Sequence, residues 1–174
     1  MKYFQLFIIA LIIISCATKP NTLADNKVFV QNNLCPDNGI CSLEITPNQS
    51  LKLERDGIGM LYPQLSEGDK TLLVFEYTRH EIPDTEDSSY RELIYLELNP
   101  DALEVDFKDS NLQQVKALFA RLCFCRGQTG YYSIKQGELL IKKVDKNNYS
   151  LKMKFIMDEV PQIINRIDTV FTID

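Results

Sequence analysis

The feature that most constrains the fold of this chain is a period-two alternation of apolar and polar residues that recurs at short intervals. It is clearest near the C-terminus, where the apolar members are Tyr149, Leu151, Met153, Phe155 and Met157. Successive side chains of a strand point to opposite faces of a sheet, so this spacing predicts a strand with one buried and one wet face. A wet face is typical of antiparallel sheets and unusual in parallel ones. The sequence therefore predicts an antiparallel β protein.

Neighbouring segments extend this pattern. Residues 138–144 lead into a turn at residues 146–148, and residues 166–173 follow as a strand at a sheet edge. Residues 71–78 and 93–98 are apolar at nearly every position, which is typical of central strands covered on both faces. Together these segments predict an antiparallel meander with at least two central strands.

Two shorter strands are expected nearer the N-terminus. Apolar residues alternate over residues 41–45 and again over residues 51–53, and Pro47-Asn48 between them is a turn signal. We therefore predict a mainly β (α+β) fold that is either an antiparallel sandwich or a barrel-like meander.

One segment departs from the β pattern. Its apolar residues fall at helical spacing, and they are Leu112, Val115, Leu118, Phe119 and Leu122. Ser110 and Gln113 have the spacing of a capping box, which marks the start of a helix. We predict one amphipathic helix over about residues 111–120, packed across a sheet face or closing the end of a barrel.

The first sixteen residues have the organisation of an export signal. Met1-Lys2 is followed by an apolar stretch, by small Ser15 and by Cys16. The apolar stretch is about ten residues long, whereas a helix that crosses a bilayer needs roughly 20. Residues 13–16, Ile-Ile-Ser-Cys, resemble the lipobox of bacterial lipoproteins. A conventional cleaved signal without lipid is the alternative.

The lipoprotein resemblance implies that residues 1–15 are removed as a signal peptide and that Cys16 becomes an acylated N-terminus carrying palmitate or a similar chain. Two or more acyl chains hold a protein firmly at a membrane. Residues 16–26 are mostly small and polar, and they would form a lipidated tether to a β-rich globular domain at residues 27–174. In the family, Ala17 after the cysteine implies transfer to the outer membrane of the cell envelope, and the lack of an acidic run in residues 17–20 implies that the protein faces the periplasm.

Charge excludes one class of partner. Without residues 1–15 the chain has 18 basic and 24 acidic side chains, and no cluster of Lys and Arg is present. Nucleic-acid binding needs such a cluster, so no nucleic-acid partner is expected. An acidic chain is also not drawn to anionic headgroups, so the membrane attachment is assigned to the lipid.

Four further cysteines, Cys35, Cys41, Cys123 and Cys125, suggest two disulfides in an exported protein, with three possible pairings. Residues two apart in an extended strand lie near the 7 Å limit between Cα atoms of a disulfide. We therefore favour bonds that tie the Cys35/Cys41 loop to the Cys123/Cys125 segment. The spacing of these cysteines fits neither a zinc site nor a redox C-x-x-C motif, so neither metal nor cofactor is expected.

The segment around the second cysteine pair also has a family resemblance. Residues 121–132, with Cys35-Pro36 and Gly39-x-Cys41, are similar to uncharacterised small lipoproteins of flavobacterial type. The resemblance supports the compartment and architecture and implies no activity. No helix pattern follows Gly127 and Gly130, so we interpret these glycines as a hairpin turn rather than a phosphate loop.

No catalytic residue is predicted. His80 is the only histidine, which excludes zinc sites with several histidines and leaves one candidate for a Ser-His-Asp triad. His80 precedes an acidic loop, and we interpret it as a solvated residue at a strand end. Asp84, Glu86 and Asp87 in that loop depart from the spacing of an EF-hand. A pair of carboxylates for glycoside cleavage stays open, because such pairs form in space.

Tyrosines near strand ends give the remaining functional hint. Tyr90, Tyr95, Tyr131 and Tyr132 are candidates for a recognition surface, with ordinary packing as the alternative. The leading hypothesis is a non-enzymatic, membrane-anchored envelope lipoprotein that binds a ligand or an envelope protein, or assists assembly. The alternatives are an anchored hydrolase or glycan-active enzyme, and a small lipid-carrying barrel.

Overall fold

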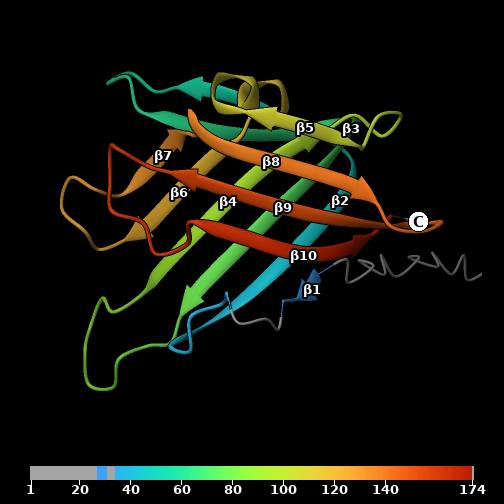
Figure 1. Ribbon diagram of the computed structural model, residues 1–174. Helices are drawn as coiled ribbons and strands as arrows, with labels where there is room; N and C mark the ends of the chain where they lie inside the picture. Colours follow the sequence, from blue (N-terminus) through green and yellow to red (C-terminus); the bar gives the residue numbers. More distant parts are fainter. Residues whose placement is uncertain (1–26, 31–33, 174) are drawn as a thin grey trace, which may run out of the picture.

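The computed structural model describes residues 27–30 and 34–173, so the predicted signal peptide, Cys16 and the tether lie outside the described residues. The chain forms two antiparallel sheets (Figure 1). The six-stranded sheet has the order β1 (Lys27–Phe29), β2 (Gly39–Arg55), β3 (Leu61–Arg79), β4 (Tyr90–Leu98), β6 (Leu118–Cys123) and β7 (Gly130–Ser133). The four-stranded sheet has the order β10 (Arg166–Thr172), β9 (Asn148–Ile156), β8 (Gln136–Lys143) and β5 (Val105–Lys108). The predicted antiparallel β-rich fold is thus confirmed as a sandwich.

Alternation along the strands builds the core between the sheets. Leu151, Met153 and Phe155 of β9 point inward, and each is at most 2% exposed, whereas Lys152 and Lys154 between them are exposed. Apolar burial of this kind is worth roughly 25 cal/mol per Å² removed from water. The meander β8–β9–β10 forms as predicted, with β10 at the edge of its sheet.

The predicted helix is shorter than expected. A 3-10 helix, η1 (Asp109–Val115), ends at Lys116, whose φ of 48° places it in the left-handed region. Leu118 and Phe119 then begin β6, and their side chains enter cores on opposite faces of the six-stranded sheet. The expectation of a helix to residue 120 was wrong because a strand buried on both faces has apolar residues at successive positions, which also satisfies a helical spacing.

The expected turn at Pro47-Asn48 is instead a bend within one long strand. The β2–β3 register shifts between Pro47 and Gln49, and Asn48 has a φ of 56°. A Cβ on Gly68, across the bend, would lie 1.9 Å from Ser50 Oγ, so the two strands approach closely here. Beyond the bend, residues 49–67 form a two-stranded extension that we call the arm.

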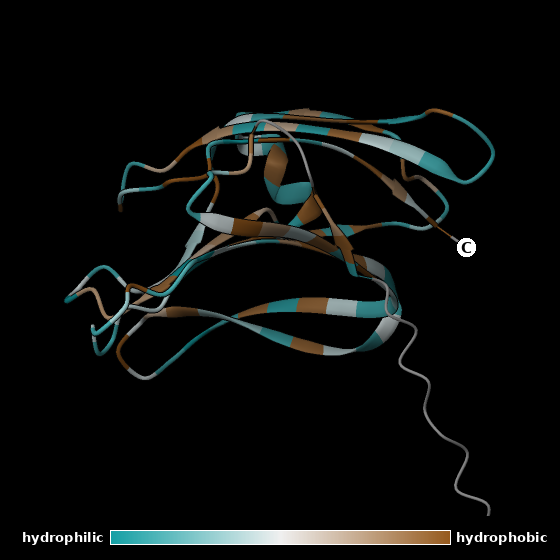
Figure 2. Cartoon of the chain, turned by 90° about the horizontal axis from the view of Figure 1, so that it is seen from below, coloured by the Kyte–Doolittle hydropathy of each residue, from teal (hydrophilic) through white to brown (hydrophobic). Residues whose placement is uncertain are grey.

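The arm covers the outer face of the six-stranded sheet. Leu51 of the arm is buried with Leu72, Leu93, Tyr95 and Leu118 in a second apolar cluster, separate from the core between the sheets. The arm therefore forms a further layer, on the side of the six-stranded sheet away from the four-stranded sheet (Figure 2). Residues 71–74 and 93–98 are covered on both faces for this reason, as their sequences predict, whereas Glu76 and Thr78 lie beyond the arm on the same outer face.

One buried carboxylate fixes the base of the arm. Glu97 accepts a hydrogen bond of 2.6 Å from the Leu51 amide and pairs with Lys116 Nζ at 2.7 Å. Lys116 Nζ also donates to the Leu51 carbonyl oxygen at 2.5 Å. The amide and the carbonyl group of Leu51 are thus both satisfied by side chains, from β4 and from the turn after η1.

Glu97→Ala is expected to loosen the arm without unfolding the sandwich. It leaves the buried Leu51 amide without an acceptor, so amides of residues 49–67 should exchange with solvent at least about tenfold faster. Hydrogen exchange measured by mass spectrometry checks this. Glu67→Ala is the control, because Glu67 is an exposed glutamate of the arm. Equal protection of the arm in Glu97→Ala and wild type would contradict the assigned role.

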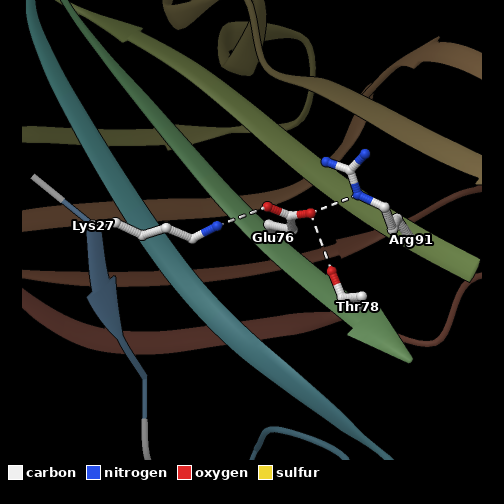
Figure 3. A network of polar contacts seen from close by, with 4 residues as sticks. All are labelled: Lys27, Glu76, Thr78 and Arg91. Carbon is white, nitrogen blue, oxygen red and sulfur yellow. Dashed lines mark hydrogen bonds and ion pairs between the residues drawn. The ribbon is translucent and has the colours of Figure 1, made fainter. Parts of the chain in front are cut away.

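Beside the arm, the same outer face carries a polar network (Figure 3). Glu76 of β3 accepts from Arg91 Nε of β4 at 2.6 Å and pairs with Lys27 Nζ of β1 at 3.2 Å. Burial alone raises the pKa of Glu76, but the hydrogen bonds from Arg91 and Lys27 outweigh burial and lower this pKa below its ordinary value. The ionised carboxylate therefore links the short edge strand β1 to β3 and β4.

Both disulfides are local, so the favoured cross-linking was wrong. Cys35 bonds to Cys41 and Cys123 bonds to Cys125, with Cα–Cα distances of 5.8 and 5.1 Å. The second bond forms because β6 ends at Cys123 and the chain turns away from the extended conformation that the 7 Å argument assumed. The chain then enters a turn closed by the Gln128 amide and the Cys125 carbonyl oxygen. The hairpin-turn interpretation of Gly127 is thereby confirmed.

Candidate functional site

A cluster of charged and aromatic side chains lies at the end of the sandwich where β4 begins. Arg79 of β3 and Arg121 of β6 flank Tyr90, with their guanidinium carbons 5.0 and 5.5 Å from the centre of its ring. Guanidinium groups at this range are attracted to the face of an aromatic ring. We call Arg79, Tyr90, Glu92 and Arg121 the Tyr90 cluster.

Glu92 is the acidic member of the cluster and is fully buried. Its carboxylate accepts hydrogen bonds from the Tyr90 hydroxyl at 2.5 Å and from the amides of Ile163 and Ile164 at 2.7 Å each. The two isoleucines belong to the segment that connects β9 to β10, and both of these strands are part of the four-stranded sheet. Glu92 therefore joins the two sheets, and its oxygens are committed to structural contacts.

The two arginines have few partners of their own. Arg121 donates from Nε to the Tyr90 oxygen at 3.2 Å and from Nη1 to Gln128 Oε1 at 2.7 Å. Arg79 donates from Nη2 to the Ser88 carbonyl oxygen at 3.1 Å. Among the described residues, neither guanidinium lies within 4.0 Å of a carboxylate. The cluster thus has two positive charges and one negative charge.

Tyr90 remains a phenol at neutral pH. Burial, with a further contribution from the hydrogen bond to Glu92, raises the pKa of Tyr90 to about 12, although Arg121 opposes the shift. The hydroxyl therefore donates to Glu92 and accepts from Arg121, which places it between the two charged groups.

The two buried glutamates of the described residues do not share one face of their strand. Glu92 and Glu97 are the buried glutamates of the described residues, and they project from opposite faces of β4. His80 is exposed beyond the end of β3, next to the exposed acidic loop that contains Asp84, Glu86 and Asp87. In residues 27–30 and 34–173, no group of three or more His, Cys, Asp or Glu side chains could hold a metal ion.

The four predicted tyrosines do not share one surface. Tyr90 and Tyr132 lie on the side of the sandwich core, whereas Tyr95 and Tyr131 pack together on the outer face, with ring centres 6.4 Å apart. Tyr90 and Tyr95 are buried, at 5% and 8% exposure. Only Tyr90 belongs to the cluster, and its role there is to separate two cations rather than to face a partner.

Sequence reasoning missed the charged members of the cluster. Arg79, Glu92 and Arg121 each occupy an inward-pointing position of a strand, in line with Tyr77, Ile94 and Phe119. Buried charges are rare unless they are paired or hydrogen-bonded. The sequence signal for such residues is a charged side chain at a strand position where the period-two pattern calls for an apolar core residue.

A shallow hollow of about 520 Å³ lies elsewhere, on the outer face of the four-stranded sheet. Its charged lining residues are Asp106, Lys108, Glu138, Lys152, Lys154 and Arg166. Arg166 and Lys152 approach Asp168 at 3.5 and 3.9 Å. Four of these six side chains are basic and two are acidic, and Asp168 adds a third carboxylate beside Arg166 and Lys152, so the hollow is mixed in charge with a small basic excess.

Comparisons with protein-family models, with curated proteins and with solved structures find no match for this chain. In the part of the chain that the structure describes, no helix is long and apolar enough to cross a membrane.

Proposed function

We propose that this protein is a lipid-anchored, non-enzymatic binding or assembly module of the bacterial cell envelope. The observation that carries the binding role is the Tyr90 cluster, in which the carboxylate and the phenol are committed to structural hydrogen bonds. Within the described part of the chain, the guanidinium groups of Arg79 and Arg121 have N–H donors left without a partner. The two disulfides support an exported location, because such bonds persist in oxidising compartments. In this proposal the lipid is attached to Cys16, and the protein lies at the outer membrane and faces the periplasm.

The alternative functions have less support. A hydrolase that uses two carboxylates needs them on one cleft, and Glu92 and Glu97 project from opposite faces of β4. Asp106 and Glu138 do line one hollow, but both are exposed and lie among basic side chains on the outer face of the four-stranded sheet. A lipid-carrying barrel needs a closed sheet around an apolar cavity, whereas the two sheets are open and their shared core is filled by packed side chains.

Metabolic labelling with a clickable fatty acid tests the anchor. The wild type should incorporate the label and fractionate with membranes, whereas Cys16→Ala should lose both properties, because the thiol is the acylation site. Cys35→Ala with Cys41→Ala is the control, because it removes cysteines of the globular part and leaves Cys16. Equal labelling of wild type and Cys16→Ala would refute lipidation at this residue.

Affinity capture of the anchored protein from its own host tests the binding role. A defined molecule that co-purifies with wild type and is lost on disruption of the Tyr90 cluster would support it. Recovery of bulk lipid alone from both proteins would count against an assembly role.

A further inference from the structure

The Tyr90 cluster has a charge imbalance. Glu92 is its single carboxylate, and the Tyr90 hydroxyl lies between Glu92 and Arg121. Glu92 and Arg121 are also directly opposite in the β4–β6 register, so the negative charge is placed on the Arg121 side of the cluster. Arg79, on the β3 side of Tyr90, is left without an anionic partner among the described residues.

Arg79 is partly buried, which makes the lack of a partner costly. Its Nε is the one buried side-chain nitrogen or oxygen of the described residues that has no hydrogen-bond partner. Charged groups removed from water are normally paired, because their lost hydration is otherwise uncompensated. The Tyr90 ring offsets part of this cost through its electron-rich face.

Donors remain for a ligand. A guanidinium group carries five N–H donors, and among the described residues Arg79 uses one of them, from Nη2 to the Ser88 carbonyl oxygen. Its Nε is buried, so the remaining donors for a ligand are those of the two Nη atoms. Ser88 belongs to the loop between β3 and β4, and Gln128, the partner of Arg121, belongs to the loop between β6 and β7. The cluster is therefore bordered by two loops, and both lie at the left of Figure 1.

We propose that the Arg79 guanidinium, supported by the charge of Arg121, is a binding site for an oxyanion such as a carboxylate or phosphate group. The planar fork of arginine matches two oxygens of such a group, and partial burial strengthens the attraction relative to water. The carboxylates of the neighbouring loop do not occupy the site, because Glu81, Asp84, Glu86 and Asp87 are exposed and none pairs with Arg79. The inference deepens the proposed binding role, since it names the ligand chemistry.

Calorimetric titration of the full chain in neutral detergent micelles tests the site. Inorganic phosphate and acetate are the probes, each added at an ionic strength kept constant with sodium chloride. Wild type should bind at least one probe saturably, and Arg79→Gln should bind it at least about tenfold more weakly, because it loses charge-assisted hydrogen bonds. Arg166→Gln is the matched control, since Arg166 lies on the outer face of the other sheet and pairs with Asp168.

Arg79→Lys is the second variant, because it retains the charge if Arg79→Gln folds poorly. It should also bind more weakly than wild type, because an ammonium group lacks the guanidinium fork. Equal binding by wild type, Arg79→Lys and Arg79→Gln would overturn the proposal, and so would binding of every probe no stronger than that of chloride.

A further titration separates a free anion from a lipid headgroup. Micelles doped with phosphatidylglycerol should weaken phosphate binding to wild type if a headgroup competes for Arg79, whereas unchanged phosphate binding indicates a soluble ligand of the same chemistry. Failure of Cys16 labelling would remove the anchor and leave this titration unaffected, because Arg79 lies within the folded strands.

Discussion

Glu92→Ala is expected to lower the free energy of unfolding by about 3–5 kcal/mol, which is the range for removing one partner of a buried charged network. The change leaves the amides of Ile163 and Ile164 and the Tyr90 hydroxyl without their acceptor. It also removes the one carboxylate of a cluster that contains two guanidinium groups. Urea unfolding followed by circular dichroism measures the effect, since the chain has no tryptophan for fluorescence.

Glu138→Ala is the matched control for this prediction. Glu138 is an exposed glutamate in a strand of the other sheet, so its removal should change stability by no more than about 0.5 kcal/mol. A loss of less than about 1 kcal/mol in Glu92→Ala would mean that water reaches the two isoleucine amides. In that case Glu92 would not be the link between the sheets.

Much of the fold could be predicted because alternation is a local property. The meander β8–β9–β10 has one wet face, so its period of two is visible in the sequence. Leu118 and Phe119 show where this reasoning fails. The arm and the sandwich core cover both faces of the six-stranded sheet, and burial on both faces erases the alternation that distinguishes a strand from a helix.

The Tyr90 cluster could not be assembled from sequence for a different reason. Glu92 contacts Ile163 and Ile164 across 71 and 72 residues of sequence, through backbone amides that any residue type could supply. Arg79 and Arg121 meet the same ring only after β3, β4 and β6 pair in their observed register. The disulfide pairing could not be predicted from sequence for a similar reason. It depends on where β6 ends and not on cysteine spacing alone.

Gly137→Ala is expected to destabilise the protein by about 2–5 kcal/mol, because backbone strain and overpacking of a core each cost about 1–3 kcal/mol. Gly137 has a φ of +147°, a conformation that residues with a Cβ rarely adopt. An added Cβ would lie 2.2 Å from the Lys154 carbonyl oxygen and 2.8 Å from Phe155 Cα, so the backbone of β9 must move. Phe155 is fully buried against Phe119, and that movement would disturb the contact between the two sheets.

Gly57→Ala is the control for this substitution, because no atom lies within 4 Å of the position where its Cβ would be. It should leave the unfolding midpoint in urea unchanged or slightly raised, since alanine reduces the freedom of the unfolded chain. Gly137→Ala should lower the midpoint sharply while the slope of the transition is retained. Similar midpoints for the two variants would contradict the prediction, because they would show that the backbone of β9 can move away from residue 137 at little cost in stability.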